Sequence, residues 1–372
     1  MRESVVVVGG GIAGLSLASQ AAYDFDVTVL ESEFQPGYHS TGRSAAVLHI
    51  PFENDVVHRL TLDSVDFFRS PPKGFQGVAE SLSSLRIGGT AEEPEIENFL
   101  ETWIARCPWL ESLSQKELFT KCPILSKKFT SGVIDNQSLH LDVHRLLSCM
   151  RREFKELGGK IETNFRVVSI EHVHGSWKLT SDNAATVTAD ILVNAAGAWV
   201  DDVARLADIQ PIGVQARRRT GIRCKPSVFS SSWPMCYLIT DDLYFKPEGR
   251  SLMLSPCDAT PSEPCDAQPE TIDIAQAIAR LEESTTLQNV VPHECWAGLR
   301  VFVPDQWPVV GYDRDHPGFF WYGAFGGFGV QTAPGCSKLG AMLLRHTEST
   351  NSSVSVHELS PSRLNRATGG YS

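Results

Sequence analysis

The chain has 372 residues, 42% of them hydrophobic, and a formal net charge of −11. This length accommodates two domains, or one large α/β unit with a sizeable core. Acidic and basic residues are interspersed, which disfavours a nucleic-acid or anionic-membrane partner, because both require a basic face.

The chain has nine cysteines and no CxxC pair. We therefore predict no zinc site, no other metal site and no disulfide framework. The first residues run directly into an apolar segment without a charged leader. No apolar stretch approaches the ~20 residues of a membrane helix. We therefore expect a cytoplasmic protein without a membrane span.

The N-terminal segment predicts a βαβ unit. Residues 5–8 are four consecutive valines, typical of a strand covered on both faces. Helical spacing of apolar residues follows from Ile12 to Ala22, and residues 27–30 form a second strand that Glu31 ends. This order predicts a parallel sheet.

Gly9, Gly11 and Gly14 form a GxGxxG dinucleotide-binding fingerprint inside this unit. The first glycine permits the tight turn, the second lets the backbone approach a pyrophosphate, and the third lets helix and strand pack closely. Glu31 follows at the end of the second strand, where a carboxylate accepts hydrogen bonds from ribose hydroxyls and disfavours the 2′-phosphate of NADP. The fingerprint alone does not separate FAD from NAD.

Further elements suggest a discontinuous organisation. Asp142 is expected to cap a helix that reaches Leu157, and strands are expected at 167–171, 177–180 and 191–195. A strand at 319–322, a glycine-rich turn at 323–329 and a helix at 334–345 follow. Most prolines and long loops fall elsewhere, which predicts a first domain formed by 1–50, 141–215 and 295–372, and a second formed by 51–140 and 216–294.

Two segments favour FAD over NAD. Residues 40–46 are rich in hydroxyls and backbone donors, with Arg43 as a cation, which suits a pyrophosphate and a flavin ring. The chain at 323–329 is poor in side chains, so it can lie against a flat ring. The helix after it could stabilise negative charge on the reduced ring. An ordinary polar loop and a ligand-free glycine turn are the alternative interpretations.

Four longer motifs carry a family resemblance: QPGYHSTGRSAA at 35–46, VNAAGAW at 193–199, WAGLR at 296–300 and GGFGVQT at 326–332. With them the chain resembles the D-amino acid oxidase/glycine oxidase family of FAD-dependent oxidoreductases, the DAO family. The similarity is strongest to the bacterial D-arginine dehydrogenase subgroup, and weakest over 85–140.

The resemblance implies an α/β fold in which a Rossmann-like domain binds FAD and a discontinuous α+β domain, built on a mixed β-sheet, binds substrate. It implies a D-amino acid oxidase or dehydrogenase that transfers hydride from the substrate Cα to flavin N5, giving an imine and then a 2-oxo acid. The electron acceptor, oxygen or another, stays open.

The resemblance also assigns site residues. Arg300 and Tyr244 would hold the substrate carboxylate with help from Arg219, and the carbonyl of Gly327 would meet the amine. Without the family resemblance, each residue also has an ordinary structural interpretation. Arg300 could form a structural ion pair, Tyr244 could be an aromatic residue of a strand, and Arg219 could belong to a basic run on the surface. The FAD contacts carried over are Gly9, Gly11, Ile12, Ala13, Gly14, Glu31, Ser32, Ser40, Thr41, Gly42, Arg43, Ser44, Ala46, Val168, Ala196, Gly197, Trp199, Gly298, Gly326, Gly327, Phe328, Gly329, Val330 and Gln331.

Three pocket positions depart from the D-arginine dehydrogenase pattern. Val47 stands for a histidine, Phe52 for a tyrosine, and Gly88 for the glutamate that pairs with a cationic side chain. These changes favour a small amino acid with a neutral or apolar side chain. Glu53 or Asp55 is the alternative source of the missing acid.

Two other functions stay open. The carboxylate clamp formed by Arg219, Tyr244 and Arg300 would also bind a secondary amine with a carboxylate, or a 2-hydroxy acid. A protein of a different class, a non-catalytic FAD-bearing subunit of a complex, is the second alternative. In the sarcosine-oxidase branch a cysteine carries the flavin, whereas the matching residues 300–303 are Arg-Val-Phe-Val. Non-covalent FAD is therefore expected.

Overall fold

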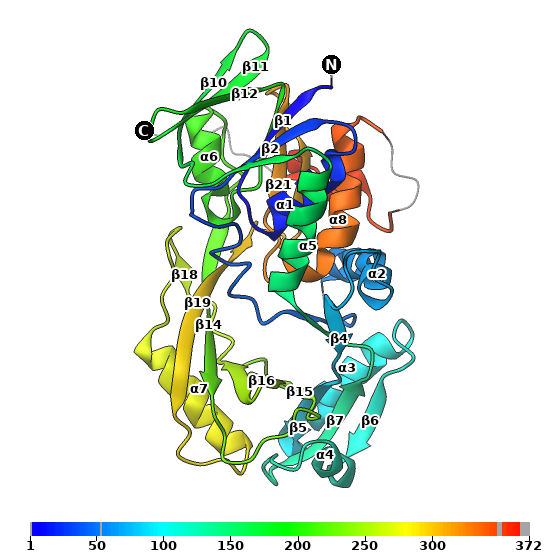
Figure 1. Ribbon diagram of the computed structural model, residues 1–372. Helices are drawn as coiled ribbons and strands as arrows, with labels where there is room; N and C mark the ends of the chain where they lie inside the picture. Colours follow the sequence, from blue (N-terminus) through cyan, green and yellow to red (C-terminus); the bar gives the residue numbers. More distant parts are fainter. Residues whose placement is uncertain (1, 53, 348–351, 365–372) are drawn as a thin grey trace.

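The computed structural model describes residues 2–52, 54–347 and 352–364, and it has the mixed α/β fold that the sequence predicts. Two large sheets dominate it, at opposite ends of Figure 1. No helix in the described part of the chain is long and apolar enough to cross a membrane.

The first sheet has six strands in the order β20-β21-β13-β1-β2-β9. Its five pairings are parallel except that of β20 with β21, so the predicted parallel βαβ opening is confirmed. Val5, Val6 and Val7 of β1 are at most 1% exposed, because layers cover both faces of the sheet. The strands are β1 (Ser4–Val8), β2 (Asp26–Leu30), β9 (Lys160–Glu162), β13 (Ile191–Asn194), β20 (Val309–Tyr312) and β21 (Phe319–Gly323).

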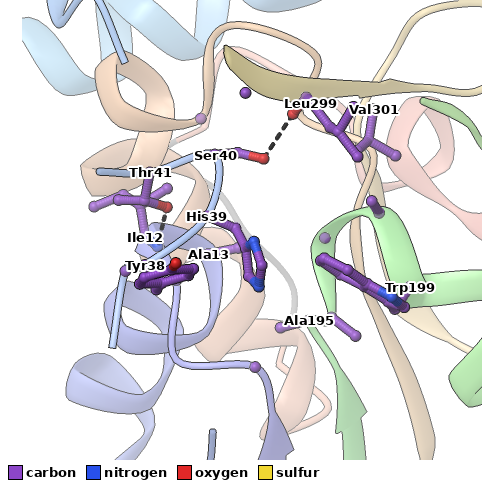
Figure 2. A pocket seen from close by; sticks show the side chains of 18 of the residues that line it. Ile12, Ala13, Tyr38, His39, Ser40, Thr41, Ala195, Trp199, Leu299 and Val301 are labelled. Carbon is purple, nitrogen blue, oxygen red and sulfur yellow. Dashed lines mark hydrogen bonds between the residues drawn. The ribbon is translucent and has the colours of Figure 1, made fainter. Parts of the chain in front are cut away.

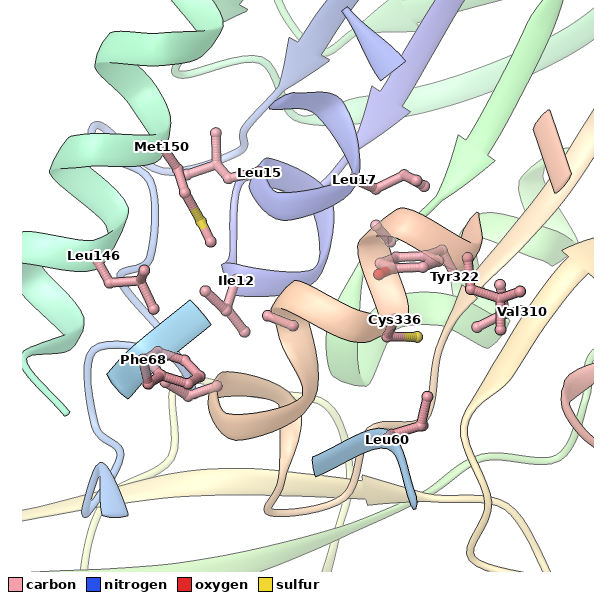
Figure 3. Packing of buried hydrophobic residues seen from close by; sticks show 14 of the residues in the cluster. Ile12, Leu15, Leu17, Leu60, Phe68, Leu146, Met150, Val310, Tyr322 and Cys336 are labelled. Carbon is pink, nitrogen blue, oxygen red and sulfur yellow. The ribbon is translucent and has the colours of Figure 1, made fainter. Parts of the chain in front are cut away.

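Four helices pack together on one face of this sheet: α1 (Ile12–Ala21), α2 (Asp55–Arg69), α5 (Val143–Glu156) and α8 (Gly329–Leu344). Figure 3 shows Leu15 of α1, Met150 of α5 and Cys336 of α8 within one apolar cluster. Asp142 caps α5, as predicted, by accepting from the backbone N–H of Arg145 at 2.8 Å.

The opposite face is covered by α6 (Val200–Leu206) and a three-stranded sheet of β10 (Val167–Val173), β11 (Ser176–Ser181) and β12 (Thr186–Ala189). The short 3-10 turn η2 (Gly197–Trp199), which precedes α6, packs against β19 (Pro292–Phe302) of the second large sheet. Trp177 of β11 is fully buried against Phe319 of β21, with ring centroids 5.7 Å apart. Two further short elements, α9 (Val356–Leu359) and η3 (Pro361–Arg363), pack against β20.

The sequence prediction is wrong on where α8 begins. The helix starts at Gly329, and Pro334 lies inside it rather than at its start. Glycine and proline are poor helix formers. Here burial of the whole first turn compensates, since Val330, Gln331, Thr332 and Ala333 are at most 8% exposed.

The second sheet has nine mixed strands, ordered β18-β14-β17-β16-β15-β5-β7-β6, with β19 also paired to β14. Side chains alternate across it. Leu85, Ile222 and Phe245 point to an apolar face covered by α7 (Thr271–Ser284) and α4 (Gln115–Lys121). The strands are β5 (Ser84–Gly89), β6 (Glu111–Ser114), β7 (Phe129–Asp135), β14 (Gln215–Cys224), β15 (Met235–Leu238), β16 (Tyr244–Glu248), β17 (Ser251–Ser255), β18 (Pro261–Ser262) and β19 (Pro292–Phe302).

A small sheet of β3 (Val47–Leu48), β8 (Leu139–Leu141) and β4 (Ala79–Ser81) joins the two halves, and η1 (Thr90–Glu92) leads into α3 (Glu93–Ile104). Two elements do not follow the predicted domain boundaries. Most of β19 falls in a range expected in the first domain, yet it pairs with β14 of the nine-stranded sheet. Conversely, α2 was expected in the second domain and packs on α8. The division into two domains stays a prediction.

Candidate active site

A long cavity of about 1140 Å³ runs between the two large sheets. Its wall includes residues from the N-terminal βαβ unit, from residues 37–45, from β10 and the 195–199 turn, and from β14, β16 and β19. Figure 2 shows Tyr38, His39 and Trp199 around it. The sequence motifs, far apart in the chain, therefore meet at one cavity.

The fingerprint glycines adopt the conformation that their spacing predicts. Gly9 has φ +108°, a value unfavourable for other residues, and a Cβ there would lie 2.4 Å from the carbonyl oxygen of Ala195. At Gly14 a Cβ would lie 1.9 Å from the carbonyl oxygen of Gly9. The helix thus approaches the first strand as closely as a dinucleotide-binding turn requires.

Glu31 is at the cavity wall and is 7% exposed. Its Oε2 accepts from the N–H of Gly10 at 2.9 Å, and its Oε1 accepts from the N–H of Glu33 at 2.9 Å and from the hydroxyl of Ser32 at 3.2 Å. These contacts fix the carboxylate at the end of β2, the position at which it would meet a ribose.

The 40–46 segment fastens this region to the second sheet. Thr41 Oγ1 accepts from the N–H of Ile12 at 3.0 Å, and Ser40 donates to the carbonyl of Leu299 at 2.6 Å (Figure 2). Ile12 begins α1, so Thr41 satisfies one of the free N–H groups of that helix.

Arg43 lines the cavity but its charge is already met by protein groups. It forms an ion pair with Asp266 and donates at 2.9 Å to the carbonyls of Ala267 and Ala297. The guanidinium therefore holds the loop that contains Asp266 against the cavity. No local sequence pattern marks Asp266, because its contact with Arg43 joins residues 223 positions apart.

Tyr38 and His39 also line the cavity, although neither was predicted as a site residue. The His39 ring lies 4.7 Å from that of Trp199, and its Nε2 is 3.0 Å from Oε1 of Glu33. Both residues belong to the 35–46 motif, and their place in that motif was the sequence feature that could have identified them as site residues.

At the other end of the cavity, Arg219 and Arg300 lie on one face of the β14–β19 pair. Arg219 is opposite Gly298, two residues from Arg300, so the arginines are diagonal neighbours. Arg219 donates through Nε to the carbonyl of Asp258 at 2.7 Å. Neither guanidinium has an ion pair with a carboxylate among the described residues, whereas adjacent Arg218 pairs with Glu270 and Asp273.

The pKa shifts follow from this arrangement. Burial and, secondarily, the charge of Arg219 lower the pKa of Arg300. Burial raises the pKa of Tyr244, and the two arginines partly offset that shift. Tyr244 therefore stays a protonated donor beside two cations. This end of the cavity is suited to an anionic group.

Gly327 completes this end of the cavity. A Cβ there would lie 2.7 Å from Cζ of Arg300, so its backbone lies directly against the guanidinium. Gly326, with φ +56°, donates its N–H to the carbonyl of Val301 at 2.8 Å, which ties the glycine-rich turn to β19.

Most predicted cofactor residues line the cavity, but five do not: Gly14, Gly42, Ala46, Phe328 and Gln331. Gly42 lies in a tight turn, its N–H bonded to the carbonyl of Gly37 at 2.9 Å. Gln331 donates to the hydroxyl of Thr61 at 2.8 Å. The predicted residues on the wall are Gly9, Gly11, Ile12, Ala13, Glu31, Ser32, Ser40, Thr41, Arg43, Ser44, Val168, Ala196, Gly197, Trp199, Gly298, Gly326, Gly327, Gly329 and Val330.

The three predicted pocket positions lie outside this wall. Val47 packs in an apolar cluster with Tyr244 and Met253. Phe52 contacts Phe328, with ring centroids 4.3 Å apart. At Gly88, by contrast, a side chain would meet Glu92 and Ile96 next to α3.

Of the two alternative acids, Asp55 is described and its carboxylate is already paired. Asp55 pairs with Arg59 at 2.8 Å and Arg106 at 3.3 Å. Glu53 lies outside the described residues.

The fold and the site together define a dinucleotide-binding oxidoreductase whose second sheet closes over the cofactor cavity. The chain belongs to the DAO family of FAD-dependent oxidoreductases, whose sequence profile matches residues 4–343. It therefore binds FAD, and the volume, the buried acid and the glycine-lined walls of the cavity fit that cofactor. The expected family is confirmed.

Individual proteins similar to this chain are also FAD-linked or amino acid oxidases by name. Glycine oxidase of Bacillus licheniformis is 23% identical over 324 residues, which cover 83% of this chain and 84% of that protein. The structure of glycine oxidase from Geobacillus kaustophilus superposes with a TM-score of 0.86 at 17% identity, covering 99% and 100% of the two chains. A dithionite-reduced L-α-glycerophosphate oxidase from Mycoplasma pneumoniae with FAD bound gives a TM-score of 0.82 at 18% identity, covering 95% of this chain and 97% of that chain.

Proposed function

We propose that the protein oxidises the carbon–nitrogen bond of a small amino acid, with FAD as the hydride acceptor. The observation that carries this proposal is the group of Arg219, Tyr244 and Arg300 at one end of the cavity. Two guanidinium groups without a carboxylate partner among the described residues, beside a protonated phenol, call for a bound carboxylate.

In this arrangement Arg300 would bind the carboxylate through its planar fork, and the hydroxyl of Tyr244 would donate to it. The Gly327 carbonyl is the proposed acceptor for the amine, since the glycine backbone lies against Arg300. When bound, FAD supplies the ring that takes up hydride from Cα, leaving an imine that water hydrolyses. The protein groups act by positioning the substrate, not as a base.

The finer part of the proposal is a D-configured substrate with a neutral or apolar side chain. The apolar cluster around Val47 and Met253 supports the neutral or apolar side chain, because a buried ammonium or guanidinium there would lack a partner. The D configuration rests on the family resemblance alone. Arg86, whose guanidinium lies 5.4 Å from the ring centroid of Tyr237 in the same cluster, would repel a cation further. The name of the Bacillus licheniformis relative supports a small amino acid.

The carboxylate clamp of Arg219, Tyr244 and Arg300 would bind a secondary amine or a 2-hydroxy acid equally well, because it contacts only the carboxylate of the substrate. A non-catalytic FAD-bearing subunit is less compatible with this group, since two adjacent, partly buried cations with no anion to bind would destabilise the protein.

An anaerobic panel tests the proposal. Purified holoenzyme is mixed with D- and L-amino acids, N-methyl amino acids and 2-hydroxy acids, and flavin absorbance is followed. We expect neutral D-amino acids to bleach the flavin fastest. Bleaching only by hydroxy acids, or by no compound, would overturn the assignment.

A further inference from the structure

A second polar group lies beyond Tyr244 on the same face of the nine-stranded sheet. Tyr237 of β15 is paired with Tyr244 of β16 on one side and with Arg86 of β5 on the other (Figure 1). The rings of Tyr237 and Tyr244 are 5.5 Å apart. Tyr237 is not among the residues that line the FAD cavity, but it packs in one cluster with Tyr244 and Met253, which do line it. A substrate side chain would therefore have to extend past Tyr244 to reach Tyr237.

Tyr237 begins a chain of hydrogen bonds that ends at a buried carboxylate. Its hydroxyl is bonded to Nε2 of His49, and Nδ1 of His49 lies 3.1 Å from Oγ of Ser138. Ser138 in turn donates to Oδ2 of Asp135 at 2.8 Å. Asp135 is 3% exposed, and Trp109 donates to its other oxygen at 2.9 Å.

The direction of every bond in this chain follows from counting protons. The single hydroxyl proton of Ser138 is used on Asp135, so Ser138 can only accept from its other neighbours. Ser84 at 3.0 Å and His49 Nδ1 must therefore both donate to it. A neutral His49 that carries its proton on Nδ1 has a bare Nε2, which accepts the proton of Tyr237.

His49 is held neutral at this position. Burial, aided by the charge of Arg86, lowers its pKa to about 3. Gln331 of α8 fixes its backbone, since the amide accepts from the N–H of His49 and donates to its carbonyl, both at 3.3 Å. The imidazole is therefore a fixed acceptor for Tyr237 and does not take up an additional proton near neutral pH.

With its own proton directed to His49, the phenol oxygen of Tyr237 has only lone pairs left for a ligand. We propose that Tyr237 is a specificity-determining residue that accepts a hydrogen bond from a neutral donor on the substrate side chain, such as a hydroxyl, an amide N–H or an indole N–H. This inference rests on the proposed function, because the clamp is what orients the side chain toward Tyr237.

The charges nearby select a neutral donor over a cationic one. Arg86 lies over the Tyr237 ring and is 20% exposed, with Asp241 as its partner at 3.4 Å. Arg219 and Arg300 add positive charge from the clamp. A hydroxyl or amide gains the hydrogen bond without this repulsion.

The first test concerns the direction of the chain and needs no ligand. In holoenzyme labelled with ¹⁵N-histidine, the His49 signals are assigned by their loss in His49→Gln. We expect the shifts of a neutral ring protonated on Nδ1, constant between pH 5.5 and 8. A ring protonated on Nε2, or one that titrates in this range, would overturn the inference.

The second test uses matched carboxylates as ligands of the oxidised holoenzyme: 4-hydroxybenzoate with 4-methylbenzoate, and 3-hydroxybenzoate with 3-methylbenzoate. Dissociation constants are measured from the change in flavin absorbance. We expect the hydroxy compound of at least one pair to bind about tenfold more tightly in wild type. Tyr237→Phe should bring that ratio close to one, with little change for the methyl compound.

Tyr312→Phe is the matched control, because Tyr312 lies on β20 of the six-stranded sheet and donates to the carbonyl of Leu344 in α8. This substitution should leave the ratio unchanged. Arg300→Ala should weaken both members of a pair alike. A ratio that Tyr237→Phe does not alter, with binding still dependent on Arg300, overturns this inference alone. If no carboxylate binds, the proposed clamp fails and this assignment fails with it.

Discussion

Arg219 and Arg300 are diagonal neighbours across the β14–β19 pair, and the charge of Arg219 contributes to lowering the pKa of Arg300. Two adjacent, partly buried cations without a carboxylate partner in the described residues repel each other, which destabilises this region of the protein. A bound carboxylate removes that penalty, which is the physical basis for the first prediction.

Replacing Arg300 with alanine should lower kcat/KM for the best substrate by about 30-fold or more, since losing one partner of a buried charge pair costs roughly 2–5 kcal/mol. FAD content should barely change. Arg217→Ala is the control, because Arg217 is opposite Arg300 in register but is outside the cavity wall and bonds Gln215. An Arg300→Ala enzyme within a few-fold of wild type would exclude the clamp.

Gly14→Ala should reduce both flavin content and thermal stability, because its Cβ would lie 1.9 Å from the carbonyl oxygen of Gly9. Helix and strand would have to separate, at a cost of roughly 1–3 kcal/mol or more. The ratio of flavin to protein absorbance and the Tm measure the effect. Gln20→Ala, on the same helix, should leave both unchanged; equal behaviour of the two variants would contradict the close-packing role.

FAD should be released without breaking a covalent bond. None of the described residues that line the cavity is a cysteine. Acid precipitation should therefore leave the yellow colour in the supernatant, where its spectrum identifies free flavin. Colour that stays with the washed precipitate would show a covalent linkage and disprove this expectation.

Stability should fall on acidification through His49. Its pKa is lowered from 6.5 to about 3 in the folded state, so between these values the unfolded state binds more protons. Stability due to this group is complete above pH 6.5 and decreases as the pH falls toward 3, by at most about 1.4 kcal/mol per pH unit. The free energy of unfolding, measured with urea between pH 7 and pH 4.5, should depend less steeply on pH for His49→Gln than for wild type. Identical slopes for the two proteins would contradict the lowered pKa of His49.

Neutral substrates should be preferred over cationic ones. We expect kcat/KM for D-leucine, D-phenylalanine or D-proline to exceed that for D-arginine by at least about tenfold, because a guanidinium near Arg86 lacks a partner. Arg86→Met should narrow this difference. If D-arginine is the best substrate, the interpretation of the pocket is wrong even though the family is right.

The sequence alone was sufficient for the FAD half of the molecule because that half is coded locally. The turn at Gly9, the close approach at Gly14 and the acid at Glu31 lie within one βαβ unit, where spacing along the chain fixes position in space. Four strands of the six-stranded sheet, β1, β2, β13 and β21, were predicted from their apolar runs, whereas the short strands β9 and β20 were not. The start of α8 was missed, because burial of Val330 to Ala333 outweighed the low helix propensity of the glycines and Pro334.

The substrate end depended on tertiary structure. Arg300 and Tyr244 came from a family resemblance, and only the register of β14, β19 and β16 shows that they share a face with Arg219. Tyr237, His49 and Asp135 are joined by hydrogen bonds across as many as 188 positions of the chain. No local pattern marks such contacts, because sheet pairing, not sequence spacing, determines which side chains meet.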